Sequence, residues 1–244
     1  MANPVLSRAG FADAHAAANE TPMTLAGTIS KTAMLMVLCA FAAGGVWATS
    51  STIGPSIGTA LTIAAVAGFA LAIGTTFMPR WAPITAPLYA LVEGVLLGGV
   101  TLLINARYAG LPLMALGLTI LAGGTMLGLY ATRVVRVTQR MRAIVTGAIV
   151  AIVLYYVVAM VLGFFHVQMP LLQGSGWLSI GFSLLVCGVA TMSFLLDFDM
   201  VERAVNNRAP HYFEWYGAFG ILVTFIWLYF EVLRLLMELS GRRR

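Results

Sequence analysis

Residues 143–165 read AIVTGAIVAIVLYYVVAMVLGFF, an apolar run that contains no charged side chain. A helix of roughly 20 apolar residues crosses the hydrocarbon core of a bilayer, so this run predicts a transmembrane helix. Further runs of the same kind occur at residues 33–50, 57–78, 83–105, 112–131, 177–198 and 213–237. The sequence therefore predicts an all-α integral membrane protein with seven transmembrane helices.

Composition and length point to the same class. Hydrophobic residues make up 60% of the 244 residues and charged residues 9%, with a mean hydropathy of +0.93. A soluble domain carries roughly 25% charged residues. Seven spans with short loops leave no room for a separate soluble domain. We expect residues 1–30 to form a mobile N-terminal tail, residues 31–240 the transmembrane domain and residues 241–244 a basic C-terminal tail.

The basic residues predict the orientation of the spans. They stand in short loops between apolar runs, which is typical of a membrane-topology signal and not of a nucleic-acid-binding surface. With the N-terminus in the cytoplasm, the cytoplasmic segments hold Arg8, Lys31, Arg80, Arg133, Arg136, Arg140, Arg142, Arg203 and Arg208. The outer side holds Arg107 and, against the rule, Arg242, Arg243 and Arg244. The balance favours a multi-pass protein with a cytoplasmic N-terminus.

Two glycine pairs have the spacing that lets helix backbones approach closely. They are Gly94 with Gly98 and Gly124 with Gly128. We expect packing within the chain at these pairs, with a dimer interface as the alternative.

Acidic side chains inside the spans are the candidate functional residues, because a central carboxylate costs about 2.5 to 3.5 kcal/mol on insertion scales. Glu93 lies near the middle of the third span, so it must be protonated, paired or bound to a cation. In the sixth span, Asp197 and Asp199 point to different sides of a helix. Asp199 has Arg203 at i+4, which favours an interfacial ion pair. Asp197 shares a mostly apolar face with the Ser193 hydroxyl, and is either an inward-facing functional acid or a helix-end residue.

The seventh span carries a further acid. Glu231 follows Thr224 by seven residues, so both lie on one face of the helix. Arg234 is three residues further on, which leaves Glu231 either as an acid that lines a pore or as half of a local salt bridge. Counting along the helices places Thr224 at the depth of Glu93.

Several kinds of chemistry lack the residues that they need. Lys31, before the first span, is the only lysine, which excludes a retinal Schiff base in a late span. All three histidines lie in the tail or the loops, so no intramembrane Ser-His pair is expected. Cys39 and Cys187 lie inside apolar runs, which argues against a disulfide or a zinc site. We expect no enzymatic activity and no resident cofactor.

Four segments of the chain point to a known family. They are residues 23–32 (MTLAGTISKT), 86–94 (APLYALVEG), 196–199 (LDFD) and 214–234 (EWYGAFGILVTFIWLYFEVLR). Together they resemble the Bax inhibitor-1 family of seven-span membrane proteins, in particular a bacterial branch of it. The last segment is the most specific of the four.

The resemblance implies a fold in which a central last helix is wrapped by the other six. It also implies a pH-sensitive calcium leak, here across the inner cell membrane, in which an acid late in the sixth span and an acid in the seventh share a proton. Asp197 matches the first acid. Thr224 occupies the position of the second, or Glu231 does in a looser register.

Our hypothesis is that Glu93, at the level of Thr224, supplies the missing charge. The resemblance further implies a gating arginine near the second span, for which Arg80 is the candidate. Oxygen ligands suit calcium, so calcium would pass or bind near Asp197 and Glu93, although such acids equally suit a proton relay.

Two other functions stay open. A non-conducting regulator of other membrane proteins, such as a membrane-bound quality-control protease, would use the N-terminal tail as its contact. A small-solute transporter would show saturable flux. Beyond the lipid bilayer and these partners, no nucleic acid is expected.

Overall fold

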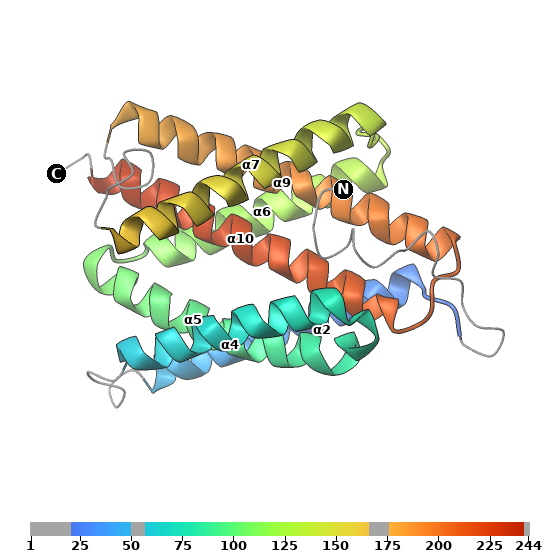
Figure 1. Cartoon of the computed structure of the whole chain (residues 1–244), viewed down its shortest axis with the longest axis horizontal. Helices are drawn as coiled ribbons and strands as arrows, with labels where there is room; N and C mark the ends of the chain where they lie inside the picture. The colour runs from blue at the N-terminus through green and yellow to red at the C-terminus, as the bar shows by residue number, and fades with distance from the viewer. Residues whose placement is uncertain (1–20, 50–56, 166–175, 242–244) are drawn as a thin grey trace. The chain divides into compact units, whose positions relative to one another are not determined.

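The computed structural model describes residues 21–49, 57–165 and 176–241. Within these ranges, seven helices are long and apolar enough to cross a membrane (Figure 1). They are α2 (Leu25–Ala48), α4 (Ile57–Phe77), α5 (Ala82–Arg107), α6 (Leu111–Ala131), α7 (Gln139–Phe164), α9 (Trp177–Asn206) and α10 (Phe213–Gly241). A single 3-10 turn, η2 (Pro79–Trp81), precedes α5. The predicted fold class is confirmed.

The helices extend beyond the apolar runs at several ends. Helix α2 begins at Leu25 because Thr24 caps it, its hydroxyl accepting a hydrogen bond from the Gly27 N–H at 2.9 Å. Residues 25–30, part of the predicted tail, therefore belong to α2. Helix α9 continues to Asn206 through the charged residues that follow Asp197. Hydropathy marks the hydrocarbon-crossing part of a helix and not its capped or interfacial ends.

The chain forms two compact units. The α2–α5 unit comprises the described residues of Asn3–Ala109 and Asp199–Val223, and the α6–α7 unit those of Gly110–Phe198 and Thr224–Arg244. Helices α9 and α10 each contribute one part to either unit.

Glycines let α5 approach its neighbours in the α2–α5 unit, where the helices lie side by side (Figure 1). A Cβ added to Gly98 would lie 2.7 Å from the Ala43 carbonyl oxygen of α2, and one added to Gly94 would overlap the Cys39 carbonyl oxygen. The expectation of packing within the chain is confirmed for this pair. No described atom lies within 4 Å of a Cβ added to Gly124 or Gly128.

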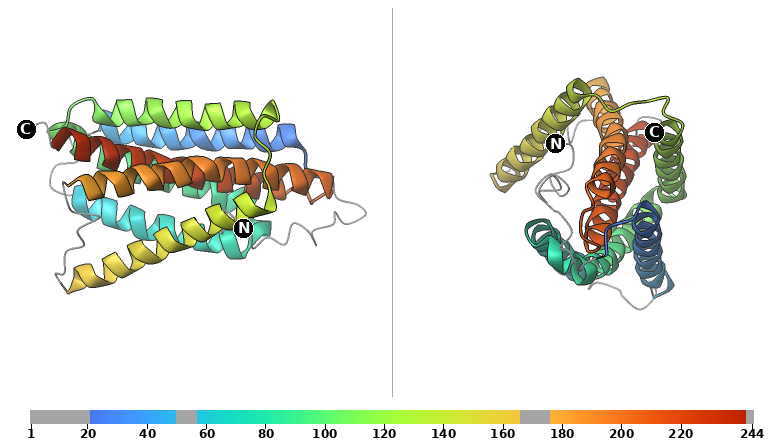
Figure 2. Two further views of the ribbon diagram at one scale, coloured as in Figure 1. Left: turned by 90° about the horizontal axis from the view of Figure 1, so that it is seen from above. Right: turned by 90° about the vertical axis from the view of Figure 1, so that its right-hand side faces the viewer.

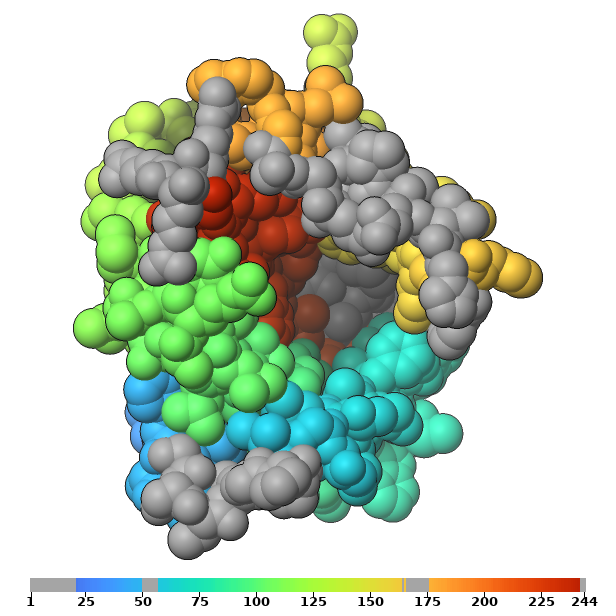
Figure 3. Space-filling model, turned by 90° about the vertical axis from the view of Figure 1, so that its left-hand side faces the viewer, coloured from blue at the N-terminus to red at the C-terminus, as the bar shows by residue number. Residues whose placement is uncertain are grey.

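The α6–α7 unit has its own apolar core. Val145 and Ile149 of α7 pack with Leu196 of α9, and Trp227 of α10 borders them. Figure 2 shows α9 (orange) running beside α10 (red), and Figure 3 shows the start of α9 next to the end of α10. These three helices are thus joined through large side chains.

Helix α10 is the most buried span. In its most apolar window 61% of the described residues are buried, against 44% or less in the other six spans. Within the α2–α5 unit, Phe219 meets Tyr89 of α5 edge to face at 5.0 Å between ring centroids. Within the α6–α7 unit, the Tyr229 hydroxyl donates to the Pro112 carbonyl of α6 at 3.4 Å. The expectation that the last helix is the central one is confirmed.

Gly94→Ala should lower the stability of the protein by about 1–3 kcal/mol, because the new methyl group overlaps the α2 backbone. Thermal unfolding in detergent measures the effect. Gly124→Ala is the matched control, since its methyl group enters open space and helix propensity favours alanine by up to about 1 kcal/mol. Equal melting temperatures for the two variants would contradict the close approach of α2 and α5.

Candidate functional site

Asp197 of α9 is completely buried within its helix bundle, with a relative exposure of 0%. Its Oδ2 accepts a hydrogen bond of 2.6 Å from the Thr224 hydroxyl of α10. Ser193, whose hydroxyl was expected on the same helix face as Asp197, donates to the Ala190 carbonyl of its own helix at 2.7 Å. A helix-end position for Asp197 is wrong, because α9 continues well past it.

Aromatic rings border the Asp197–Thr224 pair along the two helices. Phe194, one turn before Asp197, meets Phe225 of α10 edge to face with ring centroids 6.4 Å apart. Phe194 also stacks on Phe198 at 6.1 Å. The carboxylate and its hydroxyl partner therefore stand beside an apolar layer, where electrostatic interactions are stronger than in water.

Glu93 occupies the middle of α5 in the α2–α5 unit and is 9% exposed. Its carboxylate lies over Gly68 of α4, where an added Cβ would stand 2.8 Å from Oε2. The glycine thus makes room for the acid. Glu93 and Asp197 belong to different units, so their convergence on one cavity stays a prediction.

Asp199 pairs with Arg203 one turn further along α9. The Arg203 Nε also donates to the Asp199 carbonyl at 3.2 Å. Both side chains are partly exposed, at 19% for Asp199 and 40% for Arg203. The interpretation of Asp199 as half of a local ion pair is confirmed.

Glu231 has both of its oxygens engaged. Oε1 accepts from the Tyr156 hydroxyl of α7 at 2.6 Å and from the Trp227 indole at 3.2 Å. Oε2 lies 3.2 Å from Nη2 of Arg234. The local salt bridge expected as one alternative is present, and Tyr156 is a partner that the sequence did not reveal.

Arg80, the candidate gating arginine, lies in η2 and is exposed. No ion pair of Arg80 with an acid is found among the residues that the structure describes. Its gating role stays a prediction.

Two acids with partners on other helices, the partly buried Glu238 and the buried Glu214, escaped the sequence interpretation. Glu238 accepts from the Ser179 hydroxyl at 2.8 Å and from the Ser183 hydroxyl at 2.9 Å. It follows Glu231 by seven residues, the same spacing that separates Glu231 from Thr224, so helical periodicity alone could have identified it. Glu214 stood within a family segment, but only the fold reveals its partners.

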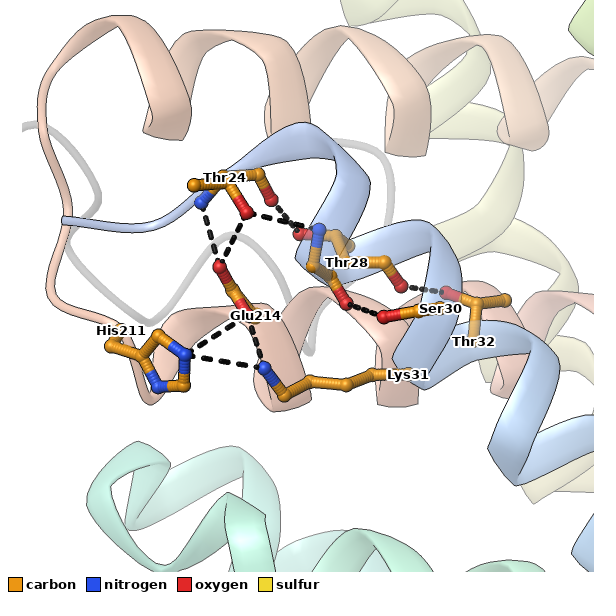
Figure 4. A network of polar contacts seen from close by, with 8 residues as sticks. Thr24, Thr28, Ser30, Lys31, Thr32, His211 and Glu214 are labelled. Atoms are coloured by element: carbon orange, nitrogen blue, oxygen red, sulfur yellow. Dashed lines mark hydrogen bonds and ion pairs between the residues drawn. The ribbon is translucent and has the colours of Figure 1, made fainter. Parts of the chain in front are cut away.

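Glu214 joins the starts of α2 and α10 in the α2–α5 unit (Figure 4). Its Oε1 accepts from the Thr24 backbone N–H at 2.7 Å and from the Thr24 hydroxyl at 2.8 Å. Its Oε2 pairs with Lys31 and lies 3.3 Å from the His211 Nε2. An added Cβ on Gly27 would overlap this carboxylate, so a side chain there would displace it. We call these residues the Glu214 clasp.

The described residues contain no group of three His, Cys, Asp or Glu side chains placed to hold a metal ion. A calcium cage takes six to eight oxygen ligands.

The fold and its buried acids define a polytopic helical membrane protein with ionisable groups inside its spans. A family model described as Bax inhibitor 1 like matches residues 3–241. The chain therefore belongs to the Bax inhibitor 1-like family. Searches of curated proteins and of solved structures gave no match.

A double-mutant cycle on the Glu214 clasp should show a coupling of about 0.5–3 kcal/mol between Lys31→Met and Glu214→Gln, the range for residues in one network. Burial causes the coupling, since Glu214 is 2% exposed and Lys31 14%. The matched cycle uses Arg203→Met and Asp199→Asn, a more exposed pair expected to couple by about 0.2–1 kcal/mol. Thermal unfolding supplies the energies, and a coupling near zero in the clasp would refute its role.

Proposed function

We propose that this protein is a pH-sensitive cation leak of the membrane, with calcium as the conducted ion and Asp197 as its central acid. The observation that carries the proposal is the completely buried Asp197 carboxylate, bonded at 2.6 Å to the Thr224 hydroxyl of the central helix. Ionisable residues inside transmembrane segments are rare and characteristically mark ion or proton pathways.

The physical argument rests on the cost of the buried acid. Insertion of a carboxylate at a helix centre costs about 2.5–3.5 kcal/mol, whereas a hydrogen bond to a charged group contributes about 1.5–3 kcal/mol. A cation that passes Asp197, or a proton that binds to it, lowers the cost of the buried charge further. Asp197 thus attracts cations into the hydrocarbon region when it is ionised and stops doing so when it is protonated.

Thr224 stands where the resemblance implies a second acid. In this proposal Glu93 supplies that second charge from α5, and Arg80 at the end of the second span is the gate. The leak lies in the inner membrane of a bacterial cell, with the N-terminus in the cytoplasm, as the basic loops favour.

Asp197→Asn should lower calcium flux through proteoliposomes by at least roughly tenfold. The reason is that a path lined by negative charge raises the local concentration of cations by about tenfold or more. It should also remove the dependence of the flux on pH. The measurement is the fluorescence of a calcium dye trapped in the vesicles, over a series of external pH values.

Glu202→Gln is the control, because it neutralises another acid of α9 outside the proposed path. Wild-type protein without calcium flux would overturn the leak. If the wild-type protein conducts calcium and Asp197→Asn conducts it equally well, Asp197 is not part of the ion path. If all acid variants behave like wild type, a regulator that acts through the N-terminal tail accounts better for the family fold.

Thr224→Val should reproduce part of the Asp197→Asn effect. The change keeps the shape of the side chain and removes the hydroxyl that donates to Asp197, so the carboxylate loses a bond worth about 1.5–3 kcal/mol. Flux and its pH profile are measured as above, with Thr119→Val as the control, since the Thr119 hydroxyl donates only to its own helix at 2.8 Å. A pH profile identical to wild type would show that Thr224 does not act on Asp197.

A further inference from the structure

One face of α10 carries polar groups at regular steps. Thr224, Glu231 and Glu238 are spaced by seven residues, so they lie above one another along the helix at intervals of about 10 Å. Thr224 is 3% exposed and Glu231 5%, and the Glu238 side chain is 10% exposed. A polar face this long and this buried is unusual in a transmembrane helix, where such residues are expensive.

Polar contacts connect the two acids without interruption. The Tyr156 hydroxyl, which donates to Glu231, accepts from Nη1 of Arg234 at 2.8 Å. The Nε of Arg234 donates to the Ser183 hydroxyl at 3.2 Å, and Ser183 donates to Glu238 at 2.9 Å. The network therefore runs from α7 through α10 to α9.

Among the residues that the structure describes, the network holds two acids and one basic side chain. Arg234 lies between the two acids, 3.2 Å from Glu231 and 3.8 Å from Glu238 measured between the nearest ion-pair atoms. One guanidinium thus faces two carboxylates, and the hydroxyls of Ser179 and Ser183 solvate the second. A network that only cross-links helices needs no surplus acid, whereas a surface that conducts cations needs one.

The part of α9 that faces these acids carries small side chains. The pairs Asp197–Thr224 and Ser183–Glu238 establish an antiparallel register between α9 and α10. The same register brings Ala190 opposite Glu231 and Cys187 opposite Arg234. Small side chains therefore face the charged stretch of α10, and both are buried.

We propose that this face of α10 is the cation route between Asp197 and the C-terminal end of the helix, with Arg234 as the electrostatic barrier within it. The inference rests on the proposed leak and deepens it, by assigning Glu231 and Glu238 as the acids that a cation meets after Asp197. Arg234 neutralises Glu231 in the arrangement described. Movement of its guanidinium towards Glu238 frees Glu231 for the cation.

Cysteine modification tests whether water reaches this face. In a Cys39→Ala protein, Cys187 is the only thiol, and a membrane-impermeant cationic methanethiosulfonate reagent is added to sealed proteoliposomes. The control is Leu184→Cys in a protein that also carries Cys39→Ala and Cys187→Ala, because Leu184 is 63% exposed on the same helix. Cys187 should react roughly tenfold faster, because only a hydrated thiol forms the reactive thiolate. An equal or slower rate overturns the route.

Flux measurements test the charges. Glu238→Gln keeps the shape of the side chain and one acceptor oxygen for a serine hydroxyl, while its amide NH2 can donate to the other. It should therefore fold and should lower cation flux roughly tenfold through the lost charge. Arg234→Gln should raise cation flux, because it removes the charge of the electrostatic barrier. General damage to the fold would not raise the flux. Arg234→Lys keeps the barrier charge and should stay close to wild type.

The reversal potential in planar bilayers measures cation selectivity, which would not change if Glu238 had only a structural role. It should shift towards weaker cation selectivity in Glu238→Gln and stay unchanged in Glu202→Gln. Wild-type protein without flux contradicts the leak itself. Normal flux and selectivity in both Glu238→Gln and Glu231→Gln, with an active wild type, contradicts this route alone.

Discussion

Charge is costly in hydrocarbon, and this constraint governs where the polar residues of the spans can stand. Glu214 meets Lys31 and Thr24, and Glu231 meets Arg234 and Tyr156. Each acid is held by a group one turn away or on another helix. Removal of one partner would leave a buried charge uncompensated, which destabilises a protein strongly. The polar contacts therefore tie specific helices together, and apolar packing fills the space around them.

The two compact units use this constraint in different ways. In the α2–α5 unit, the Glu214 clasp joins the ends of α2 and α10, while glycines of α5 bring the helix backbones together at mid-span. The acid there has a neighbouring cation and two donors from Thr24, an arrangement that stabilises a fixed structure. In the α6–α7 unit, one arginine lies between two acids, 3.2 Å from Glu231 and 3.8 Å from Glu238.

Asp197 has a hydroxyl of the neighbouring helix α10 as a hydrogen-bond partner. Its carboxylate accepts from Thr224 at the position where family resemblance implies a second acid. A hydroxyl can solvate a carboxylate but cannot share a titrating proton with it at physiological pH. In the proposed leak Thr224 therefore acts as a hydrogen-bond donor to Asp197, and the further acids Glu231 and Glu238 lie on the same face of α10 as Thr224.

The sequence by itself determined the class of the protein, the number of its spans and the cost of its intramembrane acids, because hydropathy and charge are properties of single residues and short windows. Local periodicity also predicted the Asp199–Arg203 and Glu231–Arg234 pairs, which lie within one helix. Only the tertiary structure decided that Thr224 meets Asp197, that Lys31 meets Glu214 and that Ser183 meets Glu238. Those partners lie on different helices, and their register depends on how glycines and aromatic rings let the helices approach, which no single helix encodes.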